Sequence, residues 1–458
     1  MTRAQFAGGT IAIAIVLVLL GLAAGRRVLE QDVDPAAAAE GLKAVAVSPA
    51  ITHSNATASE EAHPGFLYGR ITTNGGATYE GRLRWGRGNE EAFWGDHFNG
   101  VKDENPWVAH VPPQRLPKER RPIEVFGVVF GQRVRPIDLT RPFMARFGDI
   151  VRIEPRGGDV RVTLKSGTVF DLDRFSASDF DDDVRVWDGR RGVVDLDSKR
   201  IRTIELLPTA LLNAAPSRLY GTVHTRQGDF TGFIQWDREK GIGTDELDGR
   251  TADGVLSLPF GSIRSIARRS RDSALVALLD GREIVLSSTP RGNRGTYVDD
   301  RRYGRVLIAW DAFERVEFTT CDSGPAYRDF PPGGALTGSV TTRDGRRLAG
   351  RLVYDLDESE TTETLDAPYQ GVDYTIPLGL IASVVLAERE EGDARRARVT
   401  LHDGEELQLE RAGDLGDRNA GLLIFVDGGQ RSEYVPWTDV EKIDLDRPPA
   451  TRPPPGGR

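Results

Sequence analysis

The sequence has almost no cysteine, since Cys321 is the one cysteine among 458 residues. An intrachain disulfide is therefore excluded. A catalytic thiol needs a positioned base, and no histidine lies near Cys321 in the chain, so we interpret it as a bystander in a linker. There is also no C-x-x-C motif and no histidine pair at the i, i+4 spacing of a helical zinc site.

Other motifs of catalysis are missing as well. The chain has no G-x-S-x-G, Walker loop, dinucleotide fingerprint or H-E-x-x-H. The net charge of −9 disfavours broad binding to phosphate backbones. We therefore assign no catalytic residue, no metal ligand and no cofactor, we favour a protein that is not an enzyme, and we do not expect nucleic acid as a partner.

Long hydrophobic runs are absent except at the N-terminus, where residues 6–25 carry no charge. A helix of that length spans about 30 Å, the hydrocarbon thickness of a bilayer. Two interpretations compete for residues 1–27: a retained signal anchor that contacts the membrane through residues 6–25, and a cleaved signal peptide. The unbroken run and the flanking arginines favour the anchor, and cleavage would give a secreted protein.

The segments at the two ends of the remaining chain are poor in apolar residues. Residues 28–64 are small and polar, which predicts a flexible stalk, and residues 447–458 are Pro-rich, which predicts a disordered tail. Positive charge lies on both sides of the run at residues 6–25, so it does not fix the orientation of an anchor. A cleaved signal peptide and an anchor with a cytoplasmic N-terminus both place the bulk of the chain outside the cytoplasm, in the periplasm or at the cell surface, and we adopt that placement.

What the sequence does contain is one hairpin pattern three times: LYGRITTNGGATYEGRLRW, LYGTVHTRQGDFTGFIQW and LTGSVTTRDGRRLAGRLVY. Each hairpin opens with a glycine, at Gly69, Gly221 or Gly338. A second glycine follows seven residues later, at Gly76, Gly228 or Gly345, and it can take the positive φ that a tight turn needs. Similar apolar segments follow each hairpin, which gives a period of about 110 residues. The sequence therefore predicts an all-β fold of three tandem repeats, at residues 65–209 (with an insertion at 95–146), 216–320 and 334–446.

Each repeat has two halves that run from a glycine hairpin to a closing strand, so we expect two small β-barrel modules in each. The stretch GTVHTRQGDFTGFIQWD and the closing strand FGSIRSI resemble Sm-like and SH3-like small barrels. That resemblance implies a five-stranded barrel and raises nucleic-acid binding as one alternative. The loop REKGIGTDELDG lacks the asparagine that often follows in Sm proteins, so the RNA-binding residues of the family do not carry over.

Aromatic residues and histidines supply the remaining candidates. Trp85, Trp236, Trp310 and Trp437 recur at strand ends, which favours core packing over an exposed carbohydrate platform. The insertion in the first repeat brings Trp94, His97 and Trp107 into one stretch of chain. Packing is the favoured interpretation there too, and a ligand-binding site made of these three residues is the alternative.

Two acidic stretches are interpreted as solvated turns. Asp179, Asp181 and Asp183 have the spacing of a calcium loop, but position six is Val184 and position twelve is Arg190, where glycine and glutamate are needed. The run from Asp355 to Asp366 carries many carboxylates in sequence, and we expect it to be a solvated loop.

The resulting hypothesis is a non-enzymatic, membrane-anchored or exported interaction protein of the cell envelope. Its partner would be a protein or an envelope polymer, held by several weak sites on the loops after Trp85, Trp236 and Tyr354 and on the insertion. The first alternative is a carbohydrate or ligand site at Trp94, His97 and Trp107. The second is an Sm-like nucleic-acid binder.

Overall fold

The computed structural model describes residues 63–86, 92–116, 118–125, 128–136, 139, 141–176, 178–210, 216–287, 294–321, 324–386, 396–429 and 431–449. This part of the chain is all-β, so the predicted fold class is confirmed. Among these residues the one α-helix is α2, Ser178–Asp181. All of them belong to one compact body within Ala58–Arg458.

The predicted ends of the chain are largely outside this description. In the described ranges, no helix has the length and apolar character needed to cross a bilayer. The membrane segment at residues 6–25, the whole of the 1–27 signal region and the stalk up to residue 62 lie outside the described residues, as do residues 450–458 of the tail. These assignments stay predictions.

The strands fall into three groups, which we call units 1, 2 and 3. Unit 1 comprises β1 Tyr68–Thr73, β2 Thr78–Trp85, β3 His97–Val101, β4 Lys118–Val125, β5 Val128–Pro136, β6 Pro142–Arg146, β7 Ile150–Arg156, β8 Asp159–Leu164, β9 Val169–Asp173, β10 Val184–Asp188, β11 Gly192–Leu196 and β12 Ile201–Leu206. Its 3-10 turns are η2 Pro106–His110, η3 Phe147–Asp149 and η4 Ser198–Arg200.

Among the described residues, units 2 and 3 have no counterpart of the β4–β5 hairpin. Unit 2 comprises β13 Tyr220–Thr225, β14 Gly228–Trp236, β15 Glu246–Thr251, β16 Gly254–Pro259, η5 Phe260–Ser262, β17 Ile263–Arg268, β18 Ser273–Leu278, β19 Glu283–Ser287, β20 Thr296–Asp300, β21 Gly304–Ile308 and β22 Phe313–Thr319. The 3-10 turn η6, Tyr327–Asp329, follows it.

Unit 3 comprises β23 Thr337–Thr342, β24 Arg347–Val353, β25 Thr364–Tyr369, β26 Val372–Pro377, η7 Leu378–Leu380, β27 Ile381–Leu386, β28 Arg396–Leu401, β29 Glu406–Glu410, η8 Gly413–Leu415, β30 Leu422–Val426, η9 Asp427–Gly429, β31 Arg431–Val435, η10 Trp437–Asp439 and β32 Val440–Leu445.

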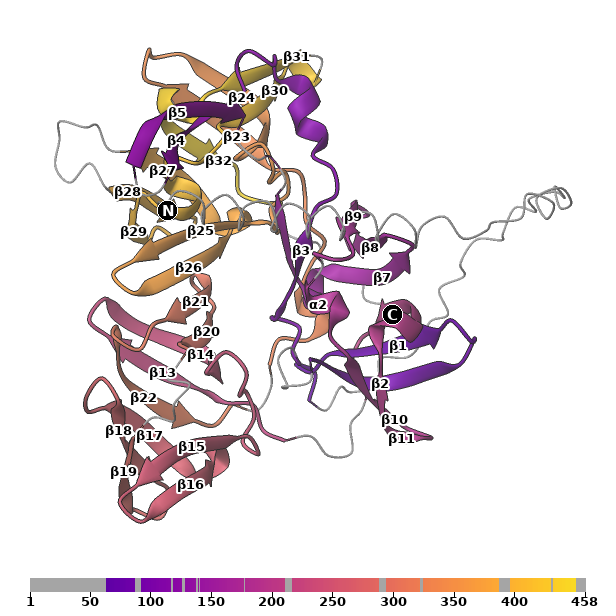
Figure 1. Cartoon of the computed structure of the whole chain (residues 1–458), viewed down its shortest axis with the longest axis vertical. Coiled ribbons are helices and arrows are strands. Elements are labelled where there is room, and N and C mark those ends of the chain that lie inside the picture. Colours follow the sequence, from indigo (N-terminus) through magenta and orange to yellow (C-terminus); the bar gives the residue numbers. More distant parts are fainter. Residues whose placement is uncertain are drawn as a thin grey trace, which may run out of the picture. The chain divides into compact units, whose positions relative to one another are not determined.

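The same antiparallel strand order occurs in each unit (Figure 1). It reads β11-β10-β2-β1-β12-β7-β8-β9 in unit 1, β21-β20-β14-β13-β22-β17-β18-β19 in unit 2 and β31-β30-β24-β23-β32-β27-β28-β29 in unit 3. In every unit the first strand therefore lies between the second strand and the last one. The remaining antiparallel pair of each unit is β3–β6, β15–β16 or β25–β26.

The glycines shared by the three hairpins explain why the pattern repeats. Gly76, Gly228 and Gly345 have φ of 80°, 136° and 81°, so the predicted positive-φ turns are confirmed. The other shared glycines form directly opposed pairs across the hairpins: Gly69 with Gly81, Gly221 with Gly232, and Gly338 with Gly350. A Cβ atom at any of these six would lie less than 3.0 Å from a carbonyl oxygen of a neighbouring strand.

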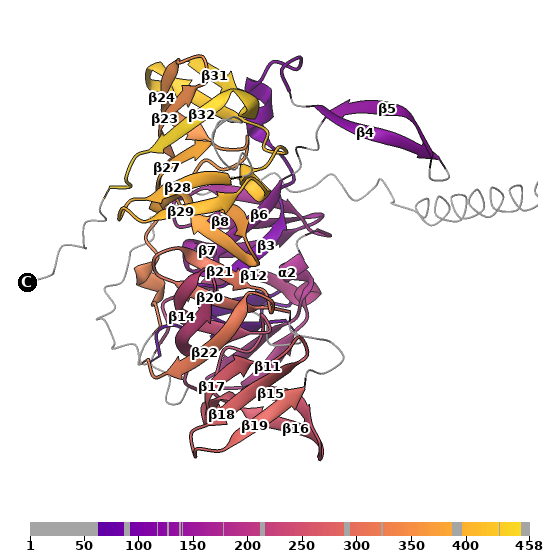
Figure 2. The same cartoon turned by 90° about the vertical axis from the view of Figure 1, so that its left-hand side faces the viewer.

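Each unit has an apolar core inside its sheet, as the alternation along the strands predicts. Trp85, Trp236 and Trp437 are buried in these cores, whereas Trp310 is half-buried and donates from its Nε1 to the Arg271 carbonyl. One continuous cluster of buried side chains serves units 2 and 3, and a second serves unit 1. In Figure 2, β4 and β5 of the insertion form a two-stranded ribbon of their own.

Candidate functional site: a groove on unit 3

The outer face of the β24–β23–β32 sheet in unit 3 is hollowed into an open groove of about 820 Å³. Thr337, Gly338, Ser339, Ala349 and Gly350 form its floor. Arg347, Arg351 and Phe425 lie along one wall, on β24 and β30, while Asp444 and Asp446 lie on the other side, on and just after β32.

Small side chains make this groove. On the outer face of unit 1 the directly opposed pairs are Tyr68 with Arg82 and Arg70 with Glu80. The strand register places Thr337 with Arg351 and Ser339 with Ala349 at the corresponding positions of unit 3. Two hydroxyl residues and an alanine therefore stand where unit 1 carries a tyrosine, an arginine and a glutamate.

In the other units this face is filled by stacked side chains. The Arg82 guanidinium lies 3.9 Å from the ring of Trp187 in unit 1. In unit 2, Tyr220 and Phe233 pack edge to face at 5.1 Å. Unit 3 keeps a similar stack at one wall, since Arg351 lies 5.9 Å from the ring of Phe425, which pairs with it as Trp187 pairs with Arg82. Its floor carries only Thr337, Ser339 and Ala349, so this face can accept a ligand.

Charges of opposite sign face each other across the floor. Arg347 donates two hydrogen bonds to the Ser339 hydroxyl, at 3.2 and 3.0 Å. Arg351 is exposed, and its guanidinium lies 5.1 Å from the ring of Trp107 and 5.9 Å from that of Phe425. In the described part of the chain no carboxylate forms an ion pair with either arginine. Two guanidinium groups are therefore available for a carboxylate of a ligand.

Of the three residues predicted for a ligand site, Trp107 borders this groove. It lies on η2, where Asn105 caps the turn by accepting from the Trp107 amide. Its ring meets Phe425 edge to face at 5.9 Å. The insertion of unit 1 thus supplies an aromatic residue beside the arginine wall of unit 3.

Trp94 and His97 lie elsewhere, in the interior of unit 1. The Trp94 indole is fully buried, donates to the Pro64 carbonyl and to the Thr209 hydroxyl at 2.9 and 3.1 Å, and packs on Tyr327. Burial, together with the positive charge of Arg305 and Arg146, holds the pKa of His97 well below its usual value. These two residues do not share a hydrophobic cluster with Trp107.

The acidic run Asp355–Asp366 was expected to be solvated, and that expectation is wrong. Asp355, Asp357, Glu360 and Glu363 are buried. Their partners come from unit 1: the Lys102 amine lies 2.7 Å from Asp357 and 3.0 Å from Glu363, and Arg141 pairs with Asp355 at 3.4 Å. Ser166 and Thr168 donate to Glu360.

Glu363 also shows how each unit holds the loop that follows its second strand. It accepts from the amides of Ser359 and Glu360, three and four residues before it. Asp96 does the same for Ala92 and Phe93, and Asp245 for Gly241 and Ile242. All three carboxylates also meet a cation from another unit: Lys102 for Glu363, Arg305 for Asp96 and Arg84 for Asp245. The loops proposed as docking sites after Trp85, Trp236 and Tyr354 are thus engaged in contacts between units.

Buried carboxylates in unit 3 keep their protons to unusually high pH. Burial raises the pKa of Asp355 to about 6, and burial with the nearby Asp366 raises the pKa of Asp414 to about 8. Burial and the neighbouring Asp357 also raise the pKa of Glu358 well above its usual value. No group of three or more His, Cys, Asp or Glu side chains in the described ranges is arranged to hold a metal ion.

Asp414→Asn is expected to remove a loss of stability that occurs as the pH rises from 3.8 to about 8. Between pH 3.8 and about 8 the folded state holds a proton on Asp414 that the unfolded chain has released. The free energy of unfolding therefore falls as the pH rises through this window, by at most about 1.4 kcal/mol per pH unit. An asparagine oxygen still accepts from the Asp366 amide.

Denaturant unfolding at pH 5 and pH 8 measures this effect. We expect the variant to gain at most about 4 kcal/mol on the wild type between the two pH values, because an asparagine at this position does not titrate. Asp417→Asn is the matched control, because the Asp417 side chain is 94% exposed. If the stability of Asp414→Asn changes with pH as much as that of the wild type, protonation of Asp414 does not cause the pH dependence.

Comparison with known proteins gives no match. No protein-family model matches the chain. No curated protein matches it. No solved structure matches it either.

Proposed function

We propose that this chain is a non-enzymatic interaction protein that binds an extended partner segment in the unit 3 groove. The observation that carries the proposal is the pair of arginines, Arg347 and Arg351, which lie on an open sheet face without a carboxylate partner in the described chain. Trp107 borders the same wall. An exposed guanidinium beside aromatic rings is a common anchor for a partner's carboxylate.

The two walls define the ligand class. Arg351 and Asp444 lie on strands that are two places apart in the sheet, so the walls are about 10 Å apart. A ligand that spans the floor would present a carboxylate to β24 and an amine or amide donor to β32. A polypeptide segment or a peptide-bearing envelope polymer has this chemistry, whereas a polyphosphate backbone would meet Asp444 and Asp446.

We propose one site of this kind in place of several equivalent weak ones. The corresponding faces of units 1 and 2 carry larger side chains, Tyr68, Arg70 and Glu80 in unit 1 and Tyr220 with Phe233 in unit 2. The membrane anchor at residues 6–25, or export after cleavage, would place this groove in the cell envelope. The proposed site combines the main hypothesis with its first alternative. Its groove belongs to a repeated β unit, and Trp107 of the insertion contacts the groove residues Arg351 and Phe425.

We also propose that residues 65–209, 216–320 and 334–446 are copies of one module with two Sm-like or SH3-like barrel halves. The identical strand order of the three units and their opposed glycine pairs support this proposal. The copies contribute differently to the site: the insertion of unit 1 provides Trp107, and the outer face of unit 3 forms the groove.

Arg351→Ala is expected to weaken binding to the groove about tenfold, because a hydrogen bond to a charged group contributes about 1.5–3 kcal/mol. The probe is a soluble octapeptide of alternating glutamate and lysine, with an all-lysine octapeptide as the reference. Titration calorimetry on the full chain should show a preference for the mixed peptide that the variant loses.

Arg398→Ala is the matched control, since Arg398 is an exposed arginine of unit 3 on β28, outside the groove. It should bind the mixed peptide as the wild type does. The proposal fails if Arg351→Ala and Arg398→Ala bind equally, or if the wild type does not distinguish the two peptides.

A further inference from the structure

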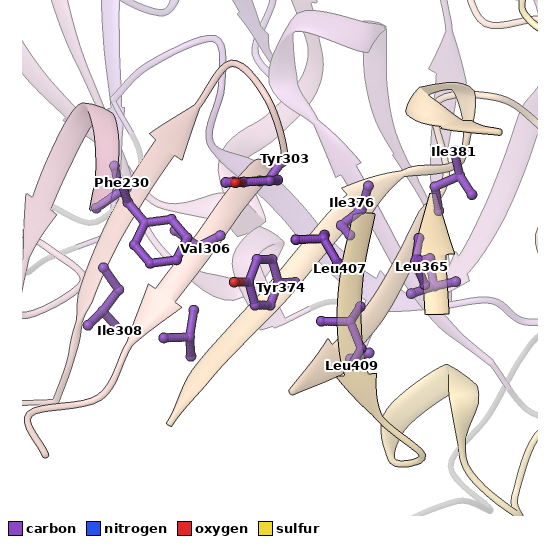
Figure 3. Close-up of a cluster of buried hydrophobic side chains, with 14 of the residues drawn as sticks. Phe230, Tyr303, Val306, Ile308, Leu365, Tyr374, Ile376, Ile381, Leu407 and Leu409 are labelled. Carbon is purple, nitrogen blue, oxygen red and sulfur yellow. The ribbon is translucent and has the colours of Figure 1, made fainter. Parts of the chain in front are cut away.

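Units 2 and 3 are joined by strand pairing. The edge strand β21 of unit 2 pairs antiparallel with β26 of unit 3, with Val306 opposite Tyr374 and Ile308 opposite Val372. Figure 3 shows the rings of Phe230, Tyr303 and Tyr374 gathered at this joint. An edge strand at this place in the unit can therefore accept the hairpin strand of another unit and continue its core.

The two strands that would make the same joint between units 1 and 2 each pair on one side only among the described residues. The counterpart of β21 in unit 1 is β11, and the counterpart of β26 in unit 2 is β16. Each ends its sheet in the described chain, and each exposes a valine: Val193 is 57% and Val255 is 74% exposed. Within one chain, units 1 and 2 meet instead through Gln235 with Asp96 and Arg84 with Asp245.

The third strand of this type, β31 in unit 3, is protected. Arg115 of the insertion donates to the Tyr434 carbonyl on β31 at 2.9 Å. The Arg115 guanidinium also lies 5.3 Å from the ring of Tyr434. A side chain thus occupies one outward carbonyl of β31, whereas β11 and β16 carry no such cover among the described residues. Natural proteins usually protect edges of this kind with charge or proline, and β11 and β16 carry one such residue each, Asp195 and Pro259.

We propose that β11 of one copy of this chain pairs antiparallel with β16 of a second copy. The hairpin glycines Gly192 and Gly304 align β11 with β21, and the last residues Pro259 and Pro377 align β16 with β26. Carried over in this way, the register of the internal joint places Val194 opposite Leu256 and Asp195 opposite Val255. Val194 and Leu256 both pack at the margin of their own cores, as Val306 and Tyr374 pack inside theirs. The pairing would therefore extend a core on one face.

The opposite face fits as well. In this register Val193 and Val255 become diagonal neighbours on the same face of adjacent strands. The pairing would bring the two exposed valines onto one side of the joint. β11 and β16 are different surfaces, so one pairing leaves a free β16 and a free β11. If these two also pair with each other, the assembly closes into a dimer, and if they pair with further copies it continues into a chain of copies.

Disulfide trapping tests the pairing on the full chain, in a Cys321→Ser background. Directly opposed strand residues lie about 4.5–5.5 Å apart, within disulfide range. We expect a mixture of the Asp195→Cys and Val255→Cys proteins to give a covalent dimer on oxidation, well above what either protein gives alone. Val285→Cys, an exposed valine on β19, is the matched partner control for Asp195→Cys and should give no such dimer.

Sedimentation of the unmodified chain at tens of micromolar gives a second measurement. We expect assembly that Val255→Lys reverses to monomer, since a charge on an edge strand opposes pairing. Monomer at all concentrations, or no selective dimer in the cysteine mixture, overturns the proposal. So does an intrachain disulfide in the Asp195→Cys, Val255→Cys double variant, because β11 and β16 of one chain would then pair with each other.

Discussion

Lys102→Met is expected to lower the free energy of unfolding by about 3–5 kcal/mol at pH 7, the usual cost of leaving a buried charge without its partner. The Lys102 side chain is 7% exposed and lies within 3.0 Å of both Asp357 and Glu363. Burial alone would lower its pKa, but Glu363 and Asp357 outweigh burial and raise it, so the amine is charged at neutral pH. Methionine fills the space and leaves two buried carboxylates unpaired.

Lys442→Met is the matched control for this prediction. Lys442 also pairs with an aspartate, Asp444, at 2.7 Å, but its side chain is 42% exposed. An exposed pair contributes about 1 kcal/mol or less. Denaturant unfolding followed by tryptophan fluorescence should separate the two variants clearly. Equal losses in both would show that the Lys102 pair is not the strong link between units 1 and 3 that its burial implies.

A double substitution identifies the cause. If the loss comes from uncompensated charge, Lys102→Met combined with Asp357→Asn should be more stable than Lys102→Met alone, although one more native contact has been removed. The link also matters for the groove, because Lys102 and Trp107 belong to the same insertion. We therefore expect Lys102→Met to weaken binding of the mixed peptide as well.

The environment of Lys102 shows what the sequence alone could not reveal. The run Asp355–Asp366 looks solvated because its carboxylates have no cations near them in the chain. Lys102 and Arg141 lie more than 200 residues away in sequence and reach it only through tertiary packing. Local composition predicts solvation, and a long-range contact with the insertion overrides it.

Periodic features, in contrast, were predictable. The shared glycines predicted the hairpin turns because positive φ is a local property of the backbone, set by the absence of a Cβ atom. Trp85 and Trp236 were predicted to pack because they recur at the same strand position. Both predictions depend on residues that are the same or similar in the three units, where unit 3 has Tyr354 at the position of the two tryptophans. Such residues maintain the fold.

The groove depends on residues that differ between the copies. Thr337, Ser339 and Ala349 stand where unit 1 has Tyr68, Arg70 and Glu80, and an alignment of the three hairpins already places them together. The signal was present in the sequence as a loss of bulk on one face of one repeat. It could be interpreted only once the strand register showed that these positions share the outer face. Trp94 and His97 were singled out by residue type, and residue type does not distinguish a buried position from an exposed one.

Gly232→Ala is expected to lower the free energy of unfolding by about 3 kcal/mol, at the upper end of what overpacking a core costs. Gly232 pairs directly with Gly221, and an added Cβ would lie less than 3.0 Å from the Asp299 carbonyl oxygen on β20. That oxygen belongs to the backbone, so the strands themselves must separate. The φ of Gly232 lies outside the positive range, so the predicted loss comes from the close approach of two strands and not from turn geometry.

Gly75→Ala is the control, because a Cβ at Gly75 meets nothing within 4 Å and its φ is also outside the positive range. We expect its stability to stay within about 1 kcal/mol of the wild type. The repeat supplies a further test: Gly81→Ala should cost as much as Gly232→Ala, since the Trp187 carbonyl blocks it in the same way. Gly350→Ala should cost at least as much, because a φ of 158° adds backbone strain to the block by the Phe425 carbonyl. Three similar losses beside an unchanged Gly75→Ala would show that one close strand approach was copied with the module. A tolerated alanine at Gly232 would mean that the shared glycines serve the turns alone.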